Sequence, residues 1–306
     1  MKNKNLISVV GPTGIGKTRL AIDLAKYFNT EIVSCDSRQF FKEMKIGTAA
    51  PSNEELAEAP HHFIGNLSVE DYYSIGQYEG DALQKLDELF EKHDTVILVG
   101  GSMMYEKAVI EGLNDLPEAN EENQKKLQEI LDNEGIEKLQ EILKELDPEY
   151  FAVVDFHNHR RLLRAIDVIW QTNKKYSEQI AVSQDSRDFK TIRIGIEAPR
   201  EELYDRINRR VDIMLEKGLL EEVKGLEKYK HLTALNTVGY AELFKYFDGE
   251  WDLKFAISEI KKNSRRYAKR QLTWYRKADD IHYLKLRYSQ EDFDGLIKYI
   301  NEKSLK

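Results

Sequence analysis

Residues 11–18 read GPTGIGKT, and this pattern restricts the possible folds of the chain more than any other feature of its sequence. It matches the phosphate-binding loop G-x-x-x-x-G-K-[ST] and lies between an apolar run at 6–10 and a helical stretch at 19–28. In such a strand–loop–helix unit, backbone N–H groups and the positive end of the helix hold an anionic phosphate. The sequence therefore predicts an α/β fold that binds a di- or triphosphate.

The side chains of this loop have separate expected roles. Lys17 should reach a phosphate oxygen, and Thr18 should offer its hydroxyl to Mg²⁺. A glycine turn that only joined a strand to a helix would not need Lys17. The predicted phosphate-binding residues of the loop are Gly11, Pro12, Thr13, Gly14, Ile15, Gly16, Lys17 and Thr18.

The length and composition of the chain indicate a cytoplasmic globular protein. Its 306 residues are enough for one large α/β domain with an insertion, or for two domains. No apolar run approaches the length that spans a bilayer, and the first strand begins too soon after Met1 to leave room for a signal peptide. The single cysteine, Cys35, excludes an internal disulfide and a multi-cysteine zinc site, which favours a reducing compartment. We expect no membrane partner.

The net charge of −8 argues against a nucleic-acid partner, but the distribution of charge points the other way. Residues 261–277, which we call the basic strip, hold eight Lys or Arg and no Asp or Glu. Residues 115–149 hold twelve Asp or Glu against four Lys. A basic strip on an acidic body is typical of a nucleic-acid-binding protein whose total charge is misleading.

Short β-rich runs alternate with amphipathic stretches through most of the chain. The expected strands are 6–10, 31–35, 95–99, 191–196 and 281–284. Runs separated by helices need crossover connections, so the sheet should be mostly parallel and flanked by helices, as in P-loop NTPases. Between 117 and 188 the pattern changes to helix after helix. We therefore expect an α/β core formed by 1–116 and 189–306, with an all-helical insertion domain at 117–188.

Two strand ends carry candidate site residues. Asp36 follows the second expected strand and should face the phosphate loop, because the carboxyl ends of parallel strands line the ligand cleft; alternatively, it caps the following turn. The strand 95–99 ends in Gly100 and Gly101, without the second Mg²⁺ carboxylate usual beside a phosphate loop, which weighs against a motor ATPase or an ordinary GTPase. Ser102 either offers its hydroxyl to a ligand or belongs to a plain strand-to-helix turn.

Arginine side chains form two further candidate groups. Arg206 and Arg210 are four residues apart on one helix face, where they are either clamps on a leaving phosphate or solvated charges. Arg160, Arg161 and Arg164 lie on a helical stretch of the otherwise acidic insertion, and such a cluster suits contact with a polyanion.

Taken together, eight segments resemble the tRNA dimethylallyltransferase (tRNA isopentenyltransferase) family. They stand in the family's order and cover nearly the whole chain. They are GPTGIGKT (11–18), DSRQFFKEMKIGTAAP (36–51), APHHF (59–63), ILVGGSMMY (97–105), RRLLRAI (160–166), LYDRINRRVDIML (203–215), NTVGYAELFKYFDGE (236–250) and AKRQLTWYRK (268–277). The Cys/His module of eukaryotic members does not follow, which points to a bacterial type.

The resemblance implies transfer of a dimethylallyl group from dimethylallyl diphosphate to N6 of the adenine 3′-adjacent to the anticodon, in tRNAs that read codons beginning with U. It implies that the phosphate loop holds the diphosphate of the prenyl donor together with Mg²⁺, and that Asp36 takes the N6 proton. The implied partner is the anticodon stem-loop of a tRNA, bound by a monomer.

The resemblance also assigns roles to single residues. The implied catalytic residues are Asp36, Thr13, Lys17 and Arg210, and Arg206 joins Arg210 in binding the diphosphate. The tRNA-contacting residues implied by the resemblance or by the basic strip are Asp36, Ser37, Arg38, Gln39, Ser102, Arg160, Arg161, Leu162, Leu163, Arg164, Lys269 and Arg270.

The chain departs from the family pattern at three positions. Ala50 stands where members usually have Lys, Ser102 where many have Thr, and Ile15 where Ala is usual. Ala50 cannot make any contact that this lysine makes in other members, so the difference bears on the reaction rate or on the affinity for tRNA.

Three other functions fit parts of the sequence. One is an adenylate isopentenyltransferase acting on a free nucleotide, and the second is a P-loop kinase of small molecules with Asp36 as its base. The third is an RNA-binding protein with an inactive phosphate loop. The helical insertion and the basic strip favour tRNA over a nucleotide, and the intact Lys17, Thr18 and Asp36 argue against the third function.

Overall fold

The computed structural model describes residues 4–181 and 187–305. The chain forms two compact units, which we call the α/β unit (Met1–Glu111 with Arg187–Lys306) and the helical unit (Gly112–Ser186). The helical unit begins five residues before the expected position 117 and ends two residues before 188. No helix among the described residues is long and apolar enough to cross a membrane.

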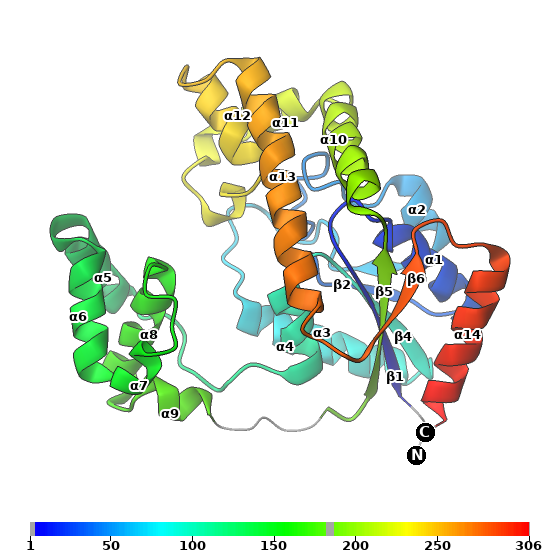
Figure 1. Ribbon diagram of the computed structural model, residues 1–306, viewed down its shortest axis with the longest axis horizontal. Helices are drawn as coiled ribbons and strands as arrows, with labels where there is room; N and C mark the ends of the chain where they lie inside the picture. The colour runs from blue at the N-terminus through cyan, green and yellow to red at the C-terminus, as the bar shows by residue number, and fades with distance from the viewer. Residues whose placement is uncertain (1–3, 182–186, 306) are drawn as a thin grey trace. The chain divides into compact units, whose positions relative to one another are not determined.

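A six-stranded sheet with the order β3-β2-β4-β1-β5-β6 forms the centre of the α/β unit (Figure 1). Every pair of neighbouring strands is parallel, which confirms the predicted sheet. The strands are β1 (Asn5–Val10), β2 (Ile32–Ser34), β3 (His61–His62), β4 (Thr95–Val99), β5 (Lys190–Glu197) and β6 (Ile281–Lys285). The sequence did not predict β3, because a strand of two residues is too short to show a period.

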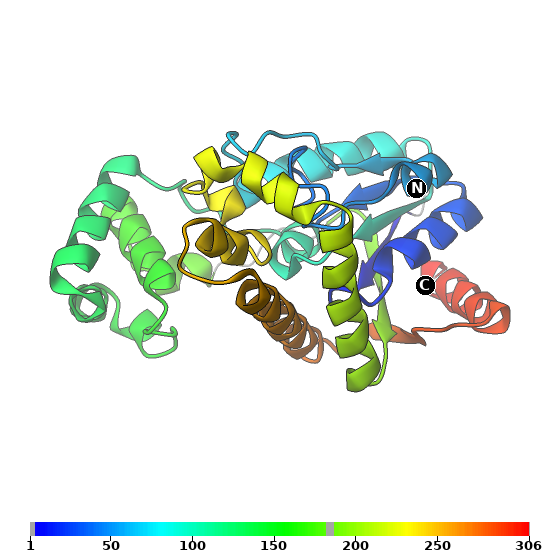
Figure 2. The ribbon, with the colours of Figure 1, turned by 90° about the horizontal axis from the view of Figure 1, so that it is seen from above.

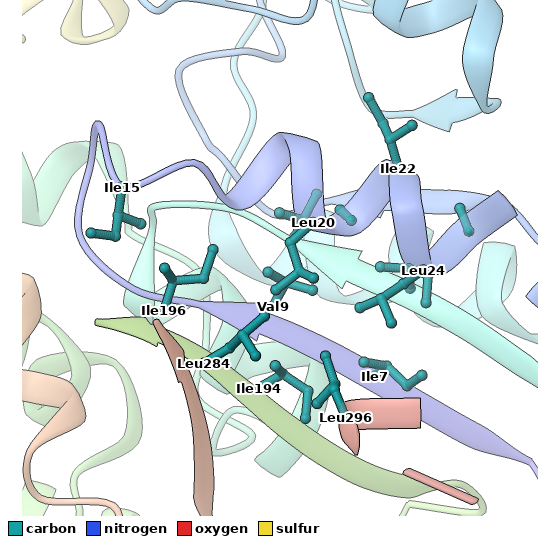
Figure 3. Packing of buried hydrophobic residues seen from close by; sticks show 14 of the residues in the cluster. Ile7, Val9, Ile15, Leu20, Ile22, Leu24, Ile194, Ile196, Leu284 and Leu296 are labelled. Carbon is teal, nitrogen blue, oxygen red and sulfur yellow. The ribbon is translucent and has the colours of Figure 1, made fainter. Parts of the chain in front are cut away.

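Alternate residues of β1 face opposite sides of the sheet, as the pleat of a strand requires. Ile7 and Val9 pack against α1 (Lys17–Phe28) and α14 (Gln290–Ser304), and Figure 3 shows this cluster at close range. Leu6 packs on the other side, against α3 (Ile75–Phe90) and α4 (Met103–Glu111). Two covered faces explain why β1 and β4 are buried along their whole length.

A group of helices extends beyond the carboxyl ends of the strands (Figures 1 and 2). These helices are α10 (Arg200–Glu216), α11 (Leu219–Gly225), α12 (Tyr240–Phe247) and α13 (Leu253–Tyr275), with the 3₁₀ turns η1 (Glu227–Tyr229) and η2 (Thr233–Leu235). Their apolar side chains form a separate core with Phe41 and Met44, from the segment after β2. The short helix α2 (Asn53–Glu58) completes the α/β unit. Two cavities lie between these helices and the carboxyl ends of the strands.

The helical unit has a core of its own. It contains α5 (Glu121–Glu134), α6 (Ile136–Leu146), α7 (Pro148–Phe151), α8 (His159–Thr172) and α9 (Tyr176–Ile180). Leu127 of α5, Leu139 and Leu143 of α6, and Ile166 of α8 are fully buried against one another. Apolar residues at this helical spacing explain why the sequence pattern from about 117 onward reads as helix after helix.

Candidate active site

The phosphate loop joins β1 to α1 in a conformation that only glycine adopts easily. Gly11, Gly14 and Gly16 have φ angles of 138°, 79° and 106°. Gly16 is the N-cap residue of α1, so the helix begins at Lys17, two residues before the predicted start. The first N–H groups of a helix have no intrahelical partner, and here they lie beside the loop. The arrangement is that of an anion-binding helix N-terminus.

Lys17 lies across its own loop. Its Nζ donates to the carbonyl oxygens of Gly11 at 2.9 Å and Pro12 at 3.0 Å. Burial lowers the pKa of Lys17 to about 8, and the positive charge of Arg210 adds to this effect while the Asp36 carboxylate opposes it. A half-buried ammonium whose partners are two neutral carbonyls is ready to accept a negatively charged ligand.

Two arginines of α10 reach the same loop. Arg206 donates from Nε to the carbonyl oxygen of Gly14 at 3.0 Å. Arg210 donates to Thr13 Oγ1 and to the carbonyl oxygen of Thr48, at 3.2 Å in each case. Burial lowers the pKa of Arg210, partly offset by the Asp36 carboxylate and reinforced by Arg206. Of the two interpretations left open by the sequence, solvated charges and phosphate clamps, this geometry favours the clamps.

Asp36 lies just past the end of β2, where β4 comes unusually close. A Cβ atom at Gly100 would lie 2.5 Å from the carbonyl carbon of Cys35, so no side chain fits there. A Cβ atom at Gly101 would lie 3.1 Å from Asp36 Oδ2. This crowding at Gly100 and Gly101 explains why no carboxylate side chain stands at the end of β4. Asp36 Oδ1 also accepts from the backbone N–H of Arg38 at 3.3 Å, so the carboxylate both closes a turn and faces the site.

The other predicted residues near Asp36 mainly hold backbone in position. Ser102 Oγ accepts from the backbone N–H of Ser37 at 3.0 Å and lies 2.9 Å from Ser37 Oγ. Gln39 donates to the carbonyl oxygens of Thr48 and Ala49 at 3.3 and 3.2 Å. These side chains fix the two segments that flank Asp36, rather than presenting free polar groups to a ligand.

The sequence analysis missed Gln271 and Tyr267 of α13. Gln271 is fully buried; its Oε1 accepts from the backbone N–H of Thr13 at 2.8 Å, and its Nε2 donates to the carbonyl oxygen of Gly101 at 2.7 Å. The Tyr267 hydroxyl donates to the same Gly101 oxygen at 2.8 Å. A helix with many charges that keeps a glutamine on its buried stripe was a signal for this role, because a buried amide needs partners.

Two cavities meet at these residues. The first, which we call the cationic cavity, has a volume of about 740 Å³ and contains the phosphate loop. Its basic lining residues are Lys17, Arg19, Lys45, Arg206, Arg210 and Lys217, which outnumber the three carboxylates of Asp36, Glu54 and Glu55. The second, which we call the apolar cavity, has a volume of about 570 Å³. Its apolar lining residues include Met103, Met104, Ile207, Val211, Met214 and Ile260. The residues common to both linings are Thr13, Asp36, Arg210, Met214 and Tyr267.

Some loop residues act through their backbone only. Ile15 is 1 % exposed and packs in the core below the loop, as Figure 3 shows. Pro12 is also buried. The expectation that these two residues bind phosphate therefore applies to the loop that they shape and not to their side chains.

The predicted tRNA-contacting residues of the helical unit differ in their exposure and in their contacts. Arg160 and Arg161 are exposed at the start of α8. Leu162 and Leu163 are 0 % and 8 % exposed and belong to the core of the unit, so the expectation that they contact tRNA is wrong for their side chains. Arg164 donates to the carbonyl oxygen of Pro117 at 2.6 Å and pairs with the buried Asp167 at 3.4 Å. Its guanidinium holds the unit together.

The predicted residues of the basic strip, Lys269 and Arg270, are exposed on α13. Arg270 and Arg38 both line the apolar cavity, and Arg38 also donates to the carbonyl oxygen of Ala234 at 3.0 Å. Cations from two segments far apart in the sequence therefore border the same cavity, and their charge is complementary to an anionic partner.

The site offers few protein side chains that could bind a metal ion. No group of three or more His, Cys, Asp or Glu side chains in the described part of the chain is placed to hold a metal ion. The Thr18 hydroxyl lines the cationic cavity, and Asp36 is the carboxylate nearest in sequence to the loop that does so. This set of donors fits a hard cation that takes most of its oxygen ligands from a bound phosphate and water, as Mg²⁺ does.

Comparisons with known proteins agree on one family. A family model described as IPP transferase matches residues 39–278. The chain is 51% identical over 298 residues to a tRNA dimethylallyltransferase from Christiangramia forsetii, covering 97% of this chain and 98% of that protein. It is 48% identical to a tRNA dimethylallyltransferase from Flavobacterium psychrophilum, over 97% of this chain and 98% of the relative.

Solved structures give the same result. The crystal structure of a tRNA isopentenylpyrophosphate transferase from Bacillus halodurans matches with a TM-score of 0.74 and 33% identity, over 99% of this chain and 97% of that one. A eukaryotic dimethylallyltransferase acting on tRNA matches with a TM-score of 0.83 and 26% identity, over 97% of this chain and 78% of that one. The family model, the relatives and the solved structures together show that the chain belongs to the IPP transferase family of tRNA dimethylallyltransferases.

Proposed function

We propose that this protein transfers a dimethylallyl group from dimethylallyl diphosphate to N6 of the adenine 3′-adjacent to the anticodon, in tRNAs that read codons beginning with U. The observation that carries the proposal is the wall common to the two cavities, where Asp36 and Arg210 face both sides. A cavity for a compact polyanion and a cavity for a flat, uncharged group meet there. Membership of the tRNA dimethylallyltransferase family supports the identity of both substrates.

The cationic cavity holds the diphosphate of the donor. Lys17 exchanges its neutral carbonyl partners for phosphate oxygens, and Arg206 and Arg210 approach from α10. The loop N–H groups and the N-terminus of α1 complete the set of donors. These groups stabilise the diphosphate most when it leaves with its full negative charge, and an interaction that strengthens in the transition state accelerates the reaction.

Thr13 links this set of donors to the reacting centre. Its Oγ1 accepts from Arg210, so its own hydroxyl proton is free to donate to an oxygen of the donor. Its backbone N–H is fixed by the buried Gln271. The hydroxyl is thereby held on the wall between the two cavities, where the oxygen of the breaking bond would lie.

In the chemical step, the bond between C1 of the allyl group and the diphosphate oxygen breaks, and a bond between C1 and adenine N6 forms. The amino nitrogen becomes strongly acidic as it is alkylated, and the Asp36 carboxylate accepts the proton that it loses. The products are N6-(dimethylallyl)adenosine in the RNA, diphosphate, and protonated Asp36, which returns its proton to water. Tyr267 and Gln271 hold Gly101 against Asp36 during this step.

Mg²⁺ fits this site as part of the bound diphosphate. Thr18 would hold it from the first turn of α1, with the remaining ligands supplied by phosphate oxygens and water. When bound, Mg²⁺ neutralises part of the charge that develops on the diphosphate. No second protein carboxylate is required, because no water molecule has to be activated in an alkyl transfer.

The acceptor adenine has to leave its stack to enter the apolar cavity, so base flipping is part of the proposal. Arg38, Arg270 and Lys269 would contact the RNA backbone near that cavity, and Arg160 and Arg161 would do so from the helical unit. We propose that the enzyme binds this RNA as a monomer.

The decisive experiment measures transfer of label from radiolabelled dimethylallyl diphosphate in the presence of Mg²⁺, with unmodified tRNA and AMP as competing acceptors. Label in tRNA alone, mapped by nuclease digestion to the adenine beside the anticodon, is the expected result. Label in AMP would instead indicate an adenylate isopentenyltransferase. Label in neither, together with ATP-dependent phosphorylation of a small molecule, would indicate the kinase; the named relatives favour neither alternative.

A further inference from the structure

The exposed side of α13 carries a shallow cavity of about 420 Å³ that takes no part in the proposed chemistry. It is lined by Arg266, Lys269, Arg270, Thr273, Trp274 and Lys277, which we call the Trp274 face. Counted from Arg266, the other positions are three, four, seven, eight and eleven residues further on, so they share one side of the helix, with Lys277 just past its end. All six residues are exposed.

The Trp274 face is strongly cationic on a protein of net charge −8. Four of its six residues are Lys or Arg, and no Asp or Glu lines it. Within the part of the chain that the structure describes, none of the four forms an ion pair with a carboxylate. Arg266 contacts the amide oxygen of Asn263 at 3.4 Å, and Arg270 lies over the Tyr267 ring at 5.6 Å. Such a surface is complementary to a polyanion.

Trp274 lies among these cations and keeps 36% of its surface exposed. A surface that contacts only water gains no stability from a large aromatic side chain surrounded by unpaired positive charges. A surface that binds single-stranded nucleic acid uses both, because each base offers a π-face for stacking and each phosphate a charge for Lys or Arg. An acidic peptide would use the cations but would leave the partly exposed indole without a stacking partner.

The Trp274 face is continuous with the proposed site. Arg270 lines both this face and the apolar cavity. On the buried side of the same helix, Gln271 holds Thr13 and Gly101 in place. Positions 270 and 274 are one helical turn apart, about 6 Å along the axis, which a neighbouring nucleotide can span. One rigid helix therefore carries both the support of the site and the aromatic platform.

We propose that Trp274 stacks with an unpaired base of the RNA substrate close to the acceptor adenine, while Arg266, Lys269, Arg270 and Lys277 contact the flanking phosphates. The platform binds a nucleotide that is not itself modified, and so holds the strand while the acceptor adenine is out of its stack. This inference rests on the proposed function, since it takes RNA as the acceptor.

The test compares RNA binding by Trp274→Ala, Trp274→Phe and Phe255→Ala with that of the wild-type protein. The ligand is an unmodified anticodon stem-loop RNA in the absence of the prenyl donor. Phe255 is the matched control, because it is an exposed aromatic residue at the other end of the same helix and is 46% exposed. We expect Trp274→Ala to weaken binding about tenfold, Trp274→Phe to retain most of the affinity, and Phe255→Ala to bind as the wild type does.

Two further measurements separate stacking from loss of charge or of fold. Lys277→Gln should reduce the slope of log Kd against log salt concentration by about one, whereas Trp274→Ala should leave that slope unchanged. RNA should quench the tryptophan fluorescence of the wild type, and Trp274→Phe should abolish that quenching although two of the three tryptophans remain. Thermal unfolding of each variant checks its fold.

Wild-type affinity in Trp274→Ala, a loss equal to that of Phe255→Ala, or unchanged quenching in Trp274→Phe would overturn the inference. It would also be overturned if an acidic peptide quenched Trp274 and stem-loop RNA did not. If RNA binding depends on Trp274 but no prenyl group is transferred, the inference stands and the proposed function fails.

Discussion

The cationic cavity and the apolar cavity share a wall, yet their linings differ in almost every other respect. The cationic cavity is formed by the phosphate loop and by basic side chains from α1 and α10. The apolar cavity is lined by methionine, isoleucine and valine side chains together with hydroxyl and amide groups. Its charged lining residues are Asp36, Arg38, Arg210, Glu242 and Arg270. In the first, positive charges concentrate around one loop, and in the second they border an apolar interior.

This difference shows how one site can bind two chemically unlike substrates. A diphosphate requires many converging N–H donors, which are easily provided by a loop and the start of a helix. A flat base requires apolar contact area and few polar groups. In the proposed mechanism the chemistry takes place at the wall, because Asp36, Thr13 and Arg210 line both cavities there. Substitutions on the wall, in one cavity or behind the wall should therefore have different kinetic signatures.

The largest effect is expected at the wall itself. Asp36→Asn keeps the shape of the side chain and the hydrogen bond from the Arg38 backbone but removes the base, so transfer should fall by about a thousandfold or more. Binding of both the diphosphate and the RNA should change little. The measurement is single-turnover transfer, with Asp205→Asn on the exposed side of α10 as the control. Equal losses of binding and rate would make Asp36 a structural residue of its turn.

The next largest effect is expected inside the cationic cavity. Lys17→Met removes the charge that meets the diphosphate and should reduce transfer by about a hundredfold to a thousandfold. Calorimetric titration with inorganic diphosphate should show the loss of affinity, while stem-loop RNA should bind as before. Lys45→Met, at the exposed rim of the same cavity, serves as the control. A Lys17→Met variant that lost RNA binding and kept diphosphate binding would contradict the assignment of the two cavities.

A smaller effect is expected at Gln271, which supports Thr13 from behind the wall. Gln271→Leu leaves the Thr13 N–H without its partner, whereas Gly101 retains the Tyr267 hydroxyl. A buried unpaired N–H costs about 1–3 kcal/mol, so the free energy of unfolding should fall by that amount. We also expect kcat to fall about tenfold with KM nearly unchanged, because Thr13 loses its position. Ser258→Leu, exposed on the same helix, is the control; a fall in stability without a change in kcat would exclude a positioning role.

The smallest effect concerns pH. In the free protein the pKa of Lys17 is about 8, and bound diphosphate favours the charged form and raises it. Diphosphate affinity is therefore full well below pH 8 and falls as pH rises through it, by roughly eightfold between pH 7.5 and 9. Binding should take up a proton in this range. Calorimetry in buffers of different ionisation enthalpy measures that uptake, and Lys17→Met should show neither the uptake nor this pH dependence.

Much of the α/β unit was predictable because its signals are local. The loop motif, the apolar runs and the long helices are each set by neighbouring residues, and all five expected strands are present in the structure. The sequence also indicated that Arg206 and Arg210 share a helix face. The helical spacing of the sequence already places Leu162 and Leu163 on an apolar face with Ile166 and Ile169, and both are buried. The expectation of tRNA contact came from the family motif RRLLR, which does not separate the residues that face solvent from those in the core.

By itself, the sequence determined the phosphate loop, the parallel sheet and the residue types available for chemistry, since these follow from short-range patterns and from strand direction. Only the tertiary structure decided how these residues are combined. Gln271 lies 258 positions from Thr13, and Arg210 lies 197 positions from it, so no local pattern could report that they meet. The close approach of β4 to Asp36 likewise depends on the packing of two strands that are adjacent in the sheet but distant in the chain. Contacts of this kind are fixed by the packing of whole elements, which is why the wall between the cavities emerges only from the folded chain.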